Sequence, residues 1–459
     1  MSDLREALLR DLPDIRLLTA PAELEHYGRD WTRRWNPAPL AIALPADTSE
    51  VQQLVRWAAR HQVCVVPSGG RTGLSGGAVA AHGELVISLD RMRQVLAFDA
   101  AARLLTVQPG LPLQAVHEAA AGHGLIYPVD FAARGSCSIG GNIATNAGGI
   151  RVIRYGNTRE WVAGLKVVTA KGELLDLNRG LVKNSSGYDL RHLMIGSEGT
   201  LGIVVEATLR LTDPPPPSQV MLLALPDMAA LMQVFELFQH RLPLQAFEFF
   251  TDVALRHVLA HGASRALDGD YPYYAVCEFD AATEAAEEVA LQAFEKAMEQ
   301  GWLLDGVLAQ SEAQAAALWR LREGITESLA PYQPYKNDVS VRISAVPAFL
   351  ADMQDLLGRE YPHIEVVWFG HIGDGNLHIN VLRPADMAAE DFIGQCERVT
   401  KLLAATLQRH GGSISAEHGI GLVKRDYLGS TRSAAEIALM QGIRRAFDPD
   451  GLLNPGKLF

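Results

Sequence analysis

The clearest alternation of apolar and polar positions lies at residues 366–382, VVWFGHIGDGNLHINVL. Two β-rich runs flank Asp374 and Gly375, a dipeptide typical of a two-residue type I′ turn, so we predict a β-hairpin. The register of such a hairpin places His371 directly opposite His378. The other face carries the apolar residues Val366, Trp368, Ile372, Ile379 and Val381.

The imidazole face of this hairpin has the residues for a metal site. Directly opposed residues have Cβ atoms about 4.5–5.5 Å apart, so one ion can take a nitrogen from both His371 and His378. Asn380 lies two residues after His378 and therefore on the same face. A cross-strand pair of structural histidines is the alternative interpretation. Because the apolar face suffices for a core, the imidazole face is left for chemistry.

Apolar periodicity elsewhere predicts helices and short strands. Residues 51–61 have the pattern of an amphipathic helix after the N-cap candidates Asp47, Thr48 and Ser49, and residues 63–66 that of a buried strand. In the second half, strand-like runs at 220–225, 244–250 and 273–279 alternate with helical patterns at 229–240 and 281–300. This order predicts an α+β domain, an antiparallel sheet with helices on one side.

Four consecutive prolines at residues 214–217 mark a domain boundary, because they form a stiff extended spacer. A chain of 459 residues is also longer than one hydrophobic core usually serves. We therefore predict a first domain at 1–213, a second at 214–425 and a C-terminal segment at 426–459 that returns to the first.

Composition excludes several functions. Hydrophobic residues make up 48% and charged residues 20% of the chain, as in ordinary globular proteins. The net charge of −12, without any basic stripe, argues against nucleic acid as a partner. No apolar run is long enough for a transmembrane segment, and residues 1–6 do not resemble a signal peptide. The 4 cysteines are scattered, so a cytoplasmic setting is expected.

Two glycine-rich stretches are candidates for ligand binding. Residues 67–77, PSGGRTGLSGG, follow a predicted strand and can turn backbone N–H groups toward an anion, although a plain surface turn explains them equally well. Residues 135–149 form a longer stretch with few bulky side chains, along whose backbone a ligand can lie. The chain has no G-x-G-x-x-G motif, so a Rossmann dinucleotide site is disfavoured.

Further candidates lie near the hairpin in sequence. A helical pattern at residues 315–326 puts Arg322 and Thr326 on one face, and Lys336 follows a turn. Each of these is also what an ordinary solvated surface residue looks like.

A second candidate stretch is the run at 413–421. There Glu417 can complete a set of two histidines and one carboxylate, typical of catalytic metal sites. The neighbouring His418 is expected to point to the opposite side of an extended segment.

The glycine-rich stretches, together with KNSSGYDL at 183–190, IGSEGTLG at 195–202 and NPGK at 454–457, resemble the p-cresol methylhydroxylase (PCMH) type FAD-binding domain of the vanillyl-alcohol oxidase superfamily. The resemblance implies an FAD site in the first domain. Arg71 stands where covalent members often place histidine, which implies non-covalent FAD. The residues implied to bind the cofactor are Pro67, Ser68, Gly69, Gly70, Arg71, Thr72, Gly73, Asp130, Ser136, Ser138, Gly140, Gly141, Asn142, Thr145, Asn146, Glu198, Gly199, Ile203 and Asn454.

The second half resembles the C-terminal domain of FAD-linked D-2-hydroxyacid dehydrogenases. By that family's pattern, a divalent metal, Zn²⁺ or Mn²⁺, binds to His371, His378 and Glu417. The implied substrate residues are Arg322, Thr326 and Lys336 for carboxylate, with Asn380 and His418 at the reacting hydroxyl.

The resemblance also implies a reaction. It is oxidation of D-2-hydroxyglutarate to 2-oxoglutarate, with hydride passing from C2 to flavin N5 and His418 as the catalytic base. D-lactate or glycolate as substrate, and a catalytically silent flavin- or metal-binding protein, are the alternatives. An electron transfer flavoprotein is the expected electron acceptor, and a homodimer is a further expectation.

Overall fold

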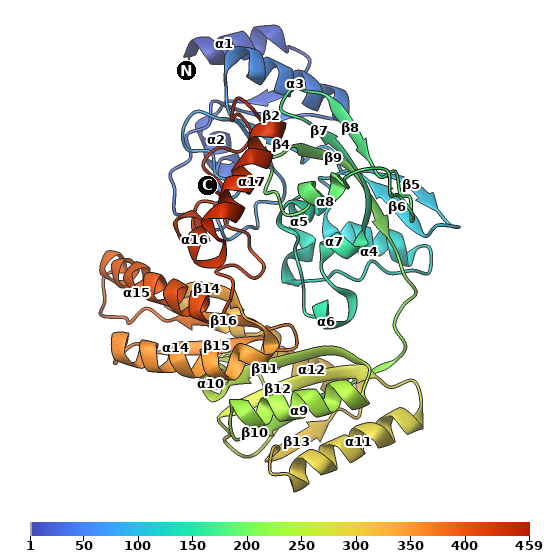
Figure 1. Ribbon diagram of the computed structural model, residues 1–459, viewed down its shortest axis with the longest axis vertical. Helices are drawn as coiled ribbons and strands as arrows, with labels where there is room; N and C mark the ends of the chain where they lie inside the picture. Colours follow the sequence, from blue (N-terminus) through green and yellow to red (C-terminus); the bar gives the residue numbers. More distant parts are fainter. Residues whose placement is uncertain (1) are drawn as a thin grey trace. The chain divides into compact units, whose positions relative to one another are not determined.

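The computed structural model describes residues 2–459, apart from the side chain of Glu284, and divides the chain into two compact units (Figure 1). Unit 1 comprises Met1–Gly149, Tyr155–Pro214 and Glu417–Phe459, and unit 2 comprises Ile150–Arg154 and Pro215–Ala416. The division after Pro214 lies inside the four-proline run. The last return to unit 1 begins at Glu417, before the expected residue 426.

Unit 1 contains two sheets. The four-stranded sheet has the order β1-β2-β4-β3 and consists of β1 (Arg16–Leu18), β2 (Ala41–Leu44), β4 (Leu85–Ser88) and β3 (Val65–Ser68). Its β2, β4 and β3 are parallel, and β1 is antiparallel to β2. The five-stranded antiparallel sheet has the order β5-β6-β9-β7-β8 and consists of β5 (Val95–Asp99), β6 (Leu104–Val107), β9 (Ile203–Arg210), β7 (Val162–Val168) and β8 (Leu174–Leu177).

Helices complete the hydrophobic cores of unit 1. They are α1 (Ser2–Asp11), α2 (Pro21–Tyr27), α3 (Thr48–His61), α4 (Leu113–Ala121), η1 (Ala132–Gly135), α5 (Ile139–Thr145), α7 (Thr158–Trp161), α8 (Arg191–Met194), η4 (Arg425–Tyr427), α16 (Leu428–Thr431) and α17 (Ala434–Phe447). The predicted amphipathic helix is α3, and its N-cap is Asp47, whose carboxylate accepts the Glu50 N–H. Leu54 and Trp57 on its apolar face are fully buried against the four-stranded sheet.

Unit 2 is built on one seven-stranded antiparallel sheet with the order β13-β10-β12-β11-β15-β16-β14. The strands are β10 (Ser218–Leu225), β11 (Leu244–Thr251), β12 (Tyr273–Asp280), β13 (Asp305–Leu308), β14 (Tyr335–Ser340), β15 (Val366–His371) and β16 (Asn376–Val381). The predicted α+β class with an antiparallel sheet is confirmed. Helix α6 (Val152–Tyr155) lies where the short Ile150–Arg154 segment of unit 2 ends.

Helices cover both faces of this sheet, so the expectation of helices on one side only was wrong. They are α9 (Met228–Arg241), α10 (Asp252–Ala260), α11 (Glu284–Glu299), α12 (Glu312–Glu323), α13 (Ile325–Ser328), η2 (Ala330–Tyr332), η3 (Ile343–Ala345), α14 (Val346–Glu360) and α15 (Ala389–Arg409). Helices α10, α12 and α13 pack on the face that includes Phe250, whereas Phe235 of α9 contacts Phe247 on the opposite face. Continuous burial of β11, with no polar alternation, is the sequence signal for a strand covered on both faces.

Within the described residues, no helix is long and apolar enough to cross a membrane.

Lys457 near the end of unit 1 is the most deeply buried cation of the chain's tail. Its side-chain amine donates to the carbonyl of Val79 at 2.7 Å, and burial lowers its pKa to about 8. The neutral form of the amine is therefore more favoured in the folded state than in the unfolded chain. Above the unfolded pKa near 10.5 the amine is neutral in both states, and its burial costs no stability. As the pH falls from there through about 8, the unfolded chain takes up a proton first and the folded state loses stability.

We predict that Lys457→Met removes this pH dependence. The free energy of unfolding of the wild type should rise relative to the variant by up to about 3 kcal/mol between pH 8 and pH 10.5, since one pKa unit is worth about 1.4 kcal/mol. Urea unfolding at a fixed FAD concentration measures it. Lys296→Met on the exposed side of α11 is the charge-matched control, and equal pH dependence of both variants would contradict the prediction.

Candidate functional site

The hairpin of β15 and β16 forms, but its register differs from the predicted one. His371 pairs with Asn376, and His378 lies opposite Phe369. The two histidines are thus diagonal neighbours, with ring centroids 5.2 Å apart and planes at 81°. A register shift by two residues keeps every side chain on its predicted face, so His371, His378 and Asn380 do share one face.

The loop explains the shift, because it contains four residues rather than two. The Asp374 carboxylate accepts the Asn376 N–H at 3.0 Å, which makes a local turn that the predicted type I′ geometry lacks. Gly375 takes a φ of +81°, whereas Asp374 stays out of the left-handed region. Gly373 donates its N–H to the Phe247 carbonyl and thereby ties the loop to β11.

Strand β14 adds the predicted residue Lys336, and also Asp338, to the same face. Lys336 lies directly opposite Asn380, and Asp338 lies opposite His378. Lys336 has an exposed surface, yet its amine is surrounded by enough protein for burial to lower its pKa. The sheet therefore places one cation, one amide and two imidazoles side by side.

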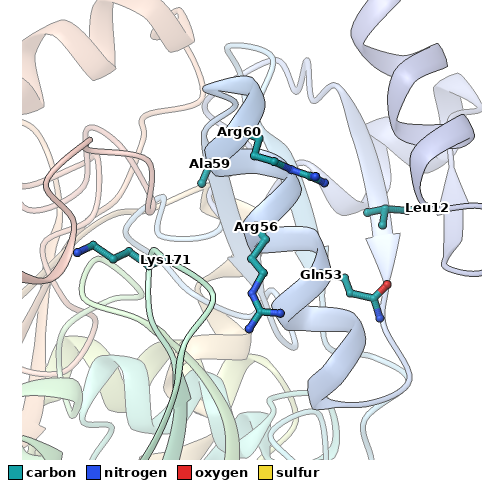
Figure 2. Close-up of a pocket in the computed structure, with 6 residues that line it drawn as sticks. All are labelled: Leu12, Gln53, Arg56, Ala59, Arg60 and Lys171. Atoms are coloured by element: carbon teal, nitrogen blue, oxygen red, sulfur yellow. The ribbon is translucent and has the colours of Figure 1, made fainter.

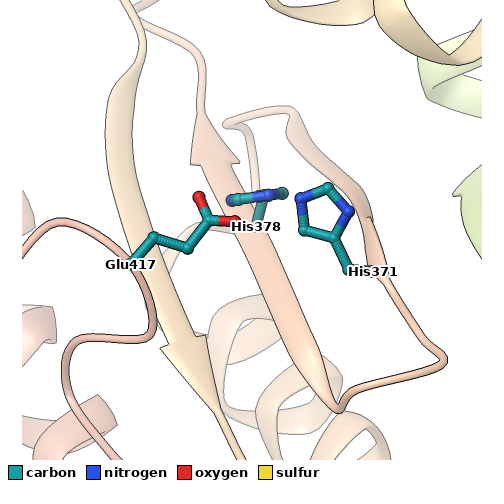
Figure 3. A group of neighbouring side chains, drawn as sticks. All are labelled: His371, His378 and Glu417. Carbon is teal, nitrogen blue, oxygen red and sulfur yellow. The ribbon is translucent and has the colours of Figure 1, made fainter. Parts of the chain in front are cut away.

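A metal-capable group forms where the chain leaves unit 2 at Ala416. One ligand atom from each of His371, His378 and Glu417 lies within 4.8 Å of the others, and Figure 3 shows the three side chains turned toward one another. Small shifts would place each about 2.0–2.2 Å from one zinc ion. Two imidazoles and a carboxylate are an ordinary donor set for Zn²⁺ or Mn²⁺, so the residues fit the implied metal.

The segment after Ala416 is bent, and the predicted divergence of Glu417 and His418 was wrong. Alternation of side chains applies to extended backbone, but residues 416–418 form a bend followed by Gly419 at a φ of +77°. The His418 imidazole lies 3.8 Å from the Glu417 carboxylate. Asp338, Glu417 and His418 form a second metal-capable group that shares Glu417 with the first.

Two buried carboxylates accompany the histidines, and neither was predicted from the sequence. Glu248 of β11 lies 2.8 Å from His371 Nδ1. Asp338 lies 3.7 Å from His378 Nδ1 and accepts the Asn376 side-chain amide at 2.8 Å. The available signal was a lone carboxylate inside the apolar run 246–250, because an ionised side chain in a buried strand needs a partner.

Arg322 extends this set from α12. It is 6% exposed, its guanidinium lies 4.8 Å from the centre of the Phe369 ring, and Nη2 lies 2.8 Å from Glu248 Oε2. Its Nε and Nη2 nevertheless lack a hydrogen-bond acceptor, because that ion pair does not have hydrogen-bond geometry. The predicted helix breaks at Gly324, and Thr326 lies on α13 with its side chain exposed.

In unit 1 the two glycine-rich stretches pack against each other. Any Cβ at Gly69 would collide with Ser138, and any at Gly70 with the backbone of Ser136. The Ser138 hydroxyl accepts the N–H groups of Gly70 at 3.2 Å and Gly141 at 3.4 Å, and it is the N-cap of α5. The predicted phosphate-binding loops are thus one structure, with backbone approach set by glycine.

Three buried atoms at predicted cofactor residues have no hydrogen-bond partner. They are the acceptors Asn454 Oδ1 and Asp130 Oδ1 and the donor Asn142 Nδ2. The Asn454 amide nitrogen donates to the carbonyls of Gly77 at 2.9 Å and Glu198 at 2.7 Å, so this residue joins three predicted motifs. Unfilled buried acceptors usually mark a missing ligand or water, and the hydroxyl and amide groups of FAD fit them.

Arg71 is fixed by its own neighbours. It lies 2.9 Å from Asp90, donates to the Gly69 carbonyl at 2.7 Å and covers the Tyr27 ring at 4.6 Å. A guanidinium held in this way is no nucleophile for covalent attachment of a flavin.

Glu198 supports the turn that follows His418. Its carboxylate accepts the N–H groups of Ile420 at 2.7 Å and Gly421 at 2.8 Å. Burial raises its pKa to about 6 in spite of these two hydrogen bonds, which act in the opposite direction. The Glu198 side chain therefore stabilises this turn of the chain.

A groove with a volume of about 530 Å³ lies elsewhere on unit 1, and its lining residues are Leu12, Gln53, Arg56, Ala59, Arg60 and Lys171 (Figure 2). Arg60 and Lys171 point away from each other in Figure 2, and Arg56 donates to the Gly172 carbonyl. These cations do not converge on one anion. None of the predicted site residues lines the groove.

Comparison with protein families identifies both halves of the chain. The model described as "FAD linked oxidases, C-terminal domain" matches residues 214–458, more than half of the chain, and the model described as "FAD binding domain" matches residues 39–178. The chain belongs to the FAD-linked oxidases. FAD is the cofactor of its first domain, and the resemblance found in the sequence is confirmed.

Curated relatives of this FAD-linked oxidase cover nearly its whole length. A D-2-hydroxyglutarate dehydrogenase of Xanthomonas citri pv. viticola is 72% identical and covers 99% of the chain and 96% of the relative. One of Stutzerimonas stutzeri is 54% identical, covering 97% and 96%. The mitochondrial D-2-hydroxyglutarate dehydrogenase of Bos taurus is 37% identical, covering 98% and 82%.

Solved structures share the fold. The 4-ethylphenol oxidase from Gulosibacter chungangensis matches with a TM-score of 0.76 at 17% identity, covering 100% of the chain and 96% of that protein. The p-cresol methylhydroxylase matches with a TM-score of 0.77 at 14% identity and the same coverage. The predicted fold of the FAD-binding domain is confirmed.

We predict that FAD is bound without a covalent bond. Acid precipitation of the purified FAD-linked oxidase should leave a colourless pellet and a yellow supernatant, because Arg71 is held by Asp90 and cannot attack the flavin. Absorbance of both fractions measures this. Flavin colour that stays with the washed pellet would contradict it.

Proposed function

We propose that the chain oxidises D-2-hydroxyglutarate to 2-oxoglutarate, with FAD as hydride acceptor and a divalent metal at His371, His378 and Glu417. The observation that carries the proposal is the metal-capable group on the same sheet face as Lys336 and next to buried Arg322. A doubly charged α-hydroxy acid is repelled by a protein whose net charge is −12, so local cations such as Lys336, Arg322 and a bound metal ion are needed to bind it. The names of the relatives at 72% and 54% identity support the same substrate.

Each residue has a role in this proposal. Arg322 offers buried donors that have no acceptor, and a guanidinium binds a carboxylate through two parallel hydrogen bonds. Lys336 offers a point charge directly opposite Asn380, whose amide is placed to bind the substrate hydroxyl. His418 accepts the hydroxyl proton, and Thr326 binds the carboxylate from α13. The metal would fix the hydroxyl and lower its pKa, and FAD would take the hydride.

A monocarboxylate is the second candidate substrate. A putative mitochondrial D-lactate dehydrogenase of Schizosaccharomyces pombe is 34% identical and covers 96% of the chain and 85% of the relative. The buried, charge-paired Arg322 together with Lys336 favours a substrate with two carboxylates over D-lactate or glycolate. An electron transfer flavoprotein as acceptor, a homodimer and a cytoplasmic setting stay predictions.

The substrate assignment predicts the order of reactivity in a panel of hydroxy acids. D-2-hydroxyglutarate should bleach the flavin fastest under anaerobic conditions, ahead of its L-enantiomer, D-lactate and glycolate. Arg322→Lys should lower kcat/KM about ten- to a hundredfold, since losing a charge-assisted contact costs on the order of 1.5–3 kcal/mol.

Exposed Arg320 on the same helix provides the control, because Arg320→Lys changes the same chemistry away from the sheet. Faster bleaching by D-lactate or glycolate would give the second candidate preference. An unaffected Arg322→Lys variant would place the carboxylate elsewhere.

The roles of Glu417 and His418 can be separated although they are neighbours. Glu417→Ala should lose metal and keep FAD, because a site with two protein ligands is weak. His418→Ala should keep metal and FAD. The rate at which substrate reduces the flavin should fall roughly a hundredfold or more, which is the usual contribution of a general base. Metal analysis and anaerobic stopped-flow absorbance measure both. Wild-type reduction by His418→Ala would assign the base to another group.

A further inference from the structure

We propose that Glu248 is a positioning residue that holds His371 ready for the metal and fixes Arg322 beside it. The inference rests on the proposed function, because it concerns the same site. Glu248 has a side-chain exposure of 1% and lies in the centre of β11. Its two oxygens go to two different residues, His371 and Arg322, that the proposal assigns to metal and to substrate.

The buried position of Glu248 argues against a role in packing alone, because burying an ionised carboxylate costs stability. Its neighbours Phe247, Phe249 and Phe250 are 0–1% exposed, so the carboxylate sits in an apolar strand. An ionised carboxylate in such surroundings is strongly destabilising unless it is paired. A well-packed apolar side chain would stabilise the sheet at least as well, which points to a role beyond packing.

The contact with His371 selects the nitrogen for the metal. The pairing of β11 with β15, continued by one residue from Phe249 and Gly370, sets Glu248 opposite His371. Glu248 Oε1 lies 2.8 Å from Nδ1, and a carboxylate oxygen can only accept, so the proton is on Nδ1. Nε2 is then the nitrogen whose lone pair can bind a metal. A carboxylate on the far side of a ligating imidazole also increases its basicity.

The contact with Glu248 orients the Arg322 guanidinium and leaves some of its N–H donors for another anion. Nη2 lies 2.8 Å from Oε2, but neither atom has a hydrogen-bond partner of good geometry, and Nε has none either. The charge of Glu248 therefore holds the guanidinium over Phe369 while donors remain for another anion. One carboxylate thus ties the orientation of a metal ligand to that of a carboxylate-binding residue.

The measurable consequence is a change in metal affinity. Glu248→Gln keeps the shape and one acceptor but removes the charge, and partners of this kind are worth ten- to a hundredfold in metal affinity. We expect Zn²⁺ to bind the variant about tenfold or more weakly than the wild type. Excess Zn²⁺ should restore part of the lost activity, which a misfolded site would not allow.

The experiment uses the full chain with FAD bound and metal removed. Zn²⁺ is titrated into a mixture of this protein and a chromophoric zinc chelator, which compete for the ion. Glu278→Gln is the matched control, since Glu278 is a buried carboxylate on the adjacent strand β12 whose hydrogen bonds go to Arg151 and Ser218. Its zinc affinity should equal that of the wild type. Glu248→Asp, which keeps the charge but is too short for both contacts, should lose affinity to a smaller extent.

Three outcomes overturn the proposal. The first is wild-type zinc affinity in folded Glu248→Gln and Glu248→Asp. The second is equal weakening by Glu248→Gln and Glu278→Gln, which would reflect damage to the sheet. The third is failure of both Glu248 variants to fold where Glu278→Gln folds, which makes the role structural.

Failure of the proposed function would look different. In that case the wild type itself would bind no zinc at His371, and His371→Ala would titrate like the wild type. Flavin bleaching by the hydroxy-acid panel tests the reaction independently of this titration.

Discussion

Burial of charge on one face of the unit 2 sheet is the constraint on which the candidate site depends. Glu248, Arg322, His371 and Asp338 are each at most 8% exposed, on strands or a helix whose other residues form the core. Such groups are tolerated only when each has a partner of opposite charge or a hydrogen bond. The pairs Glu248–Arg322 and Glu248–His371 meet this requirement and at the same time aim the side chains.

The antiparallel sheet is well suited to this arrangement. Three neighbouring strands, β15, β16 and β14, each contribute polar side chains at the same level, and regular pairing fixes their spacing. Only Glu417 and His418 come from irregular backbone, and their bend starts beside β14, where Ser340 and Ser413 form an isolated bridge. Most of the candidate site is thus built on regular, rigid elements, which suits precise placement of its side chains.

In unit 1 the constraint is the close approach of backbone segments at the predicted cofactor loops. Gly69 and Gly70 leave no room for a side chain against the second glycine-rich stretch, and Asn454 joins that region to Glu198 and the end of the chain. The unfilled acceptors of Asn454 and Asp130 show where polar atoms await a partner. The apolar clusters of this unit hold its fold, while these backbone and side-chain contacts shape the predicted cofactor loops.

The sequence by itself determined the fold class, the FAD-binding domain and the face of the hairpin that carries His371, His378 and Asn380. These depend on local pattern: glycine spacing and the two-residue alternation of a strand. Only the tertiary structure decided the register, because the contact of Gly373 with β11 ties down a four-residue loop. The bend that brings Glu417 and His418 together, the helices on both faces of the sheet and the pairing of Glu248 with His371 and Arg322 were likewise decided by distant contacts. Such contacts join residues far apart in sequence, and no local pattern encodes which of them meet.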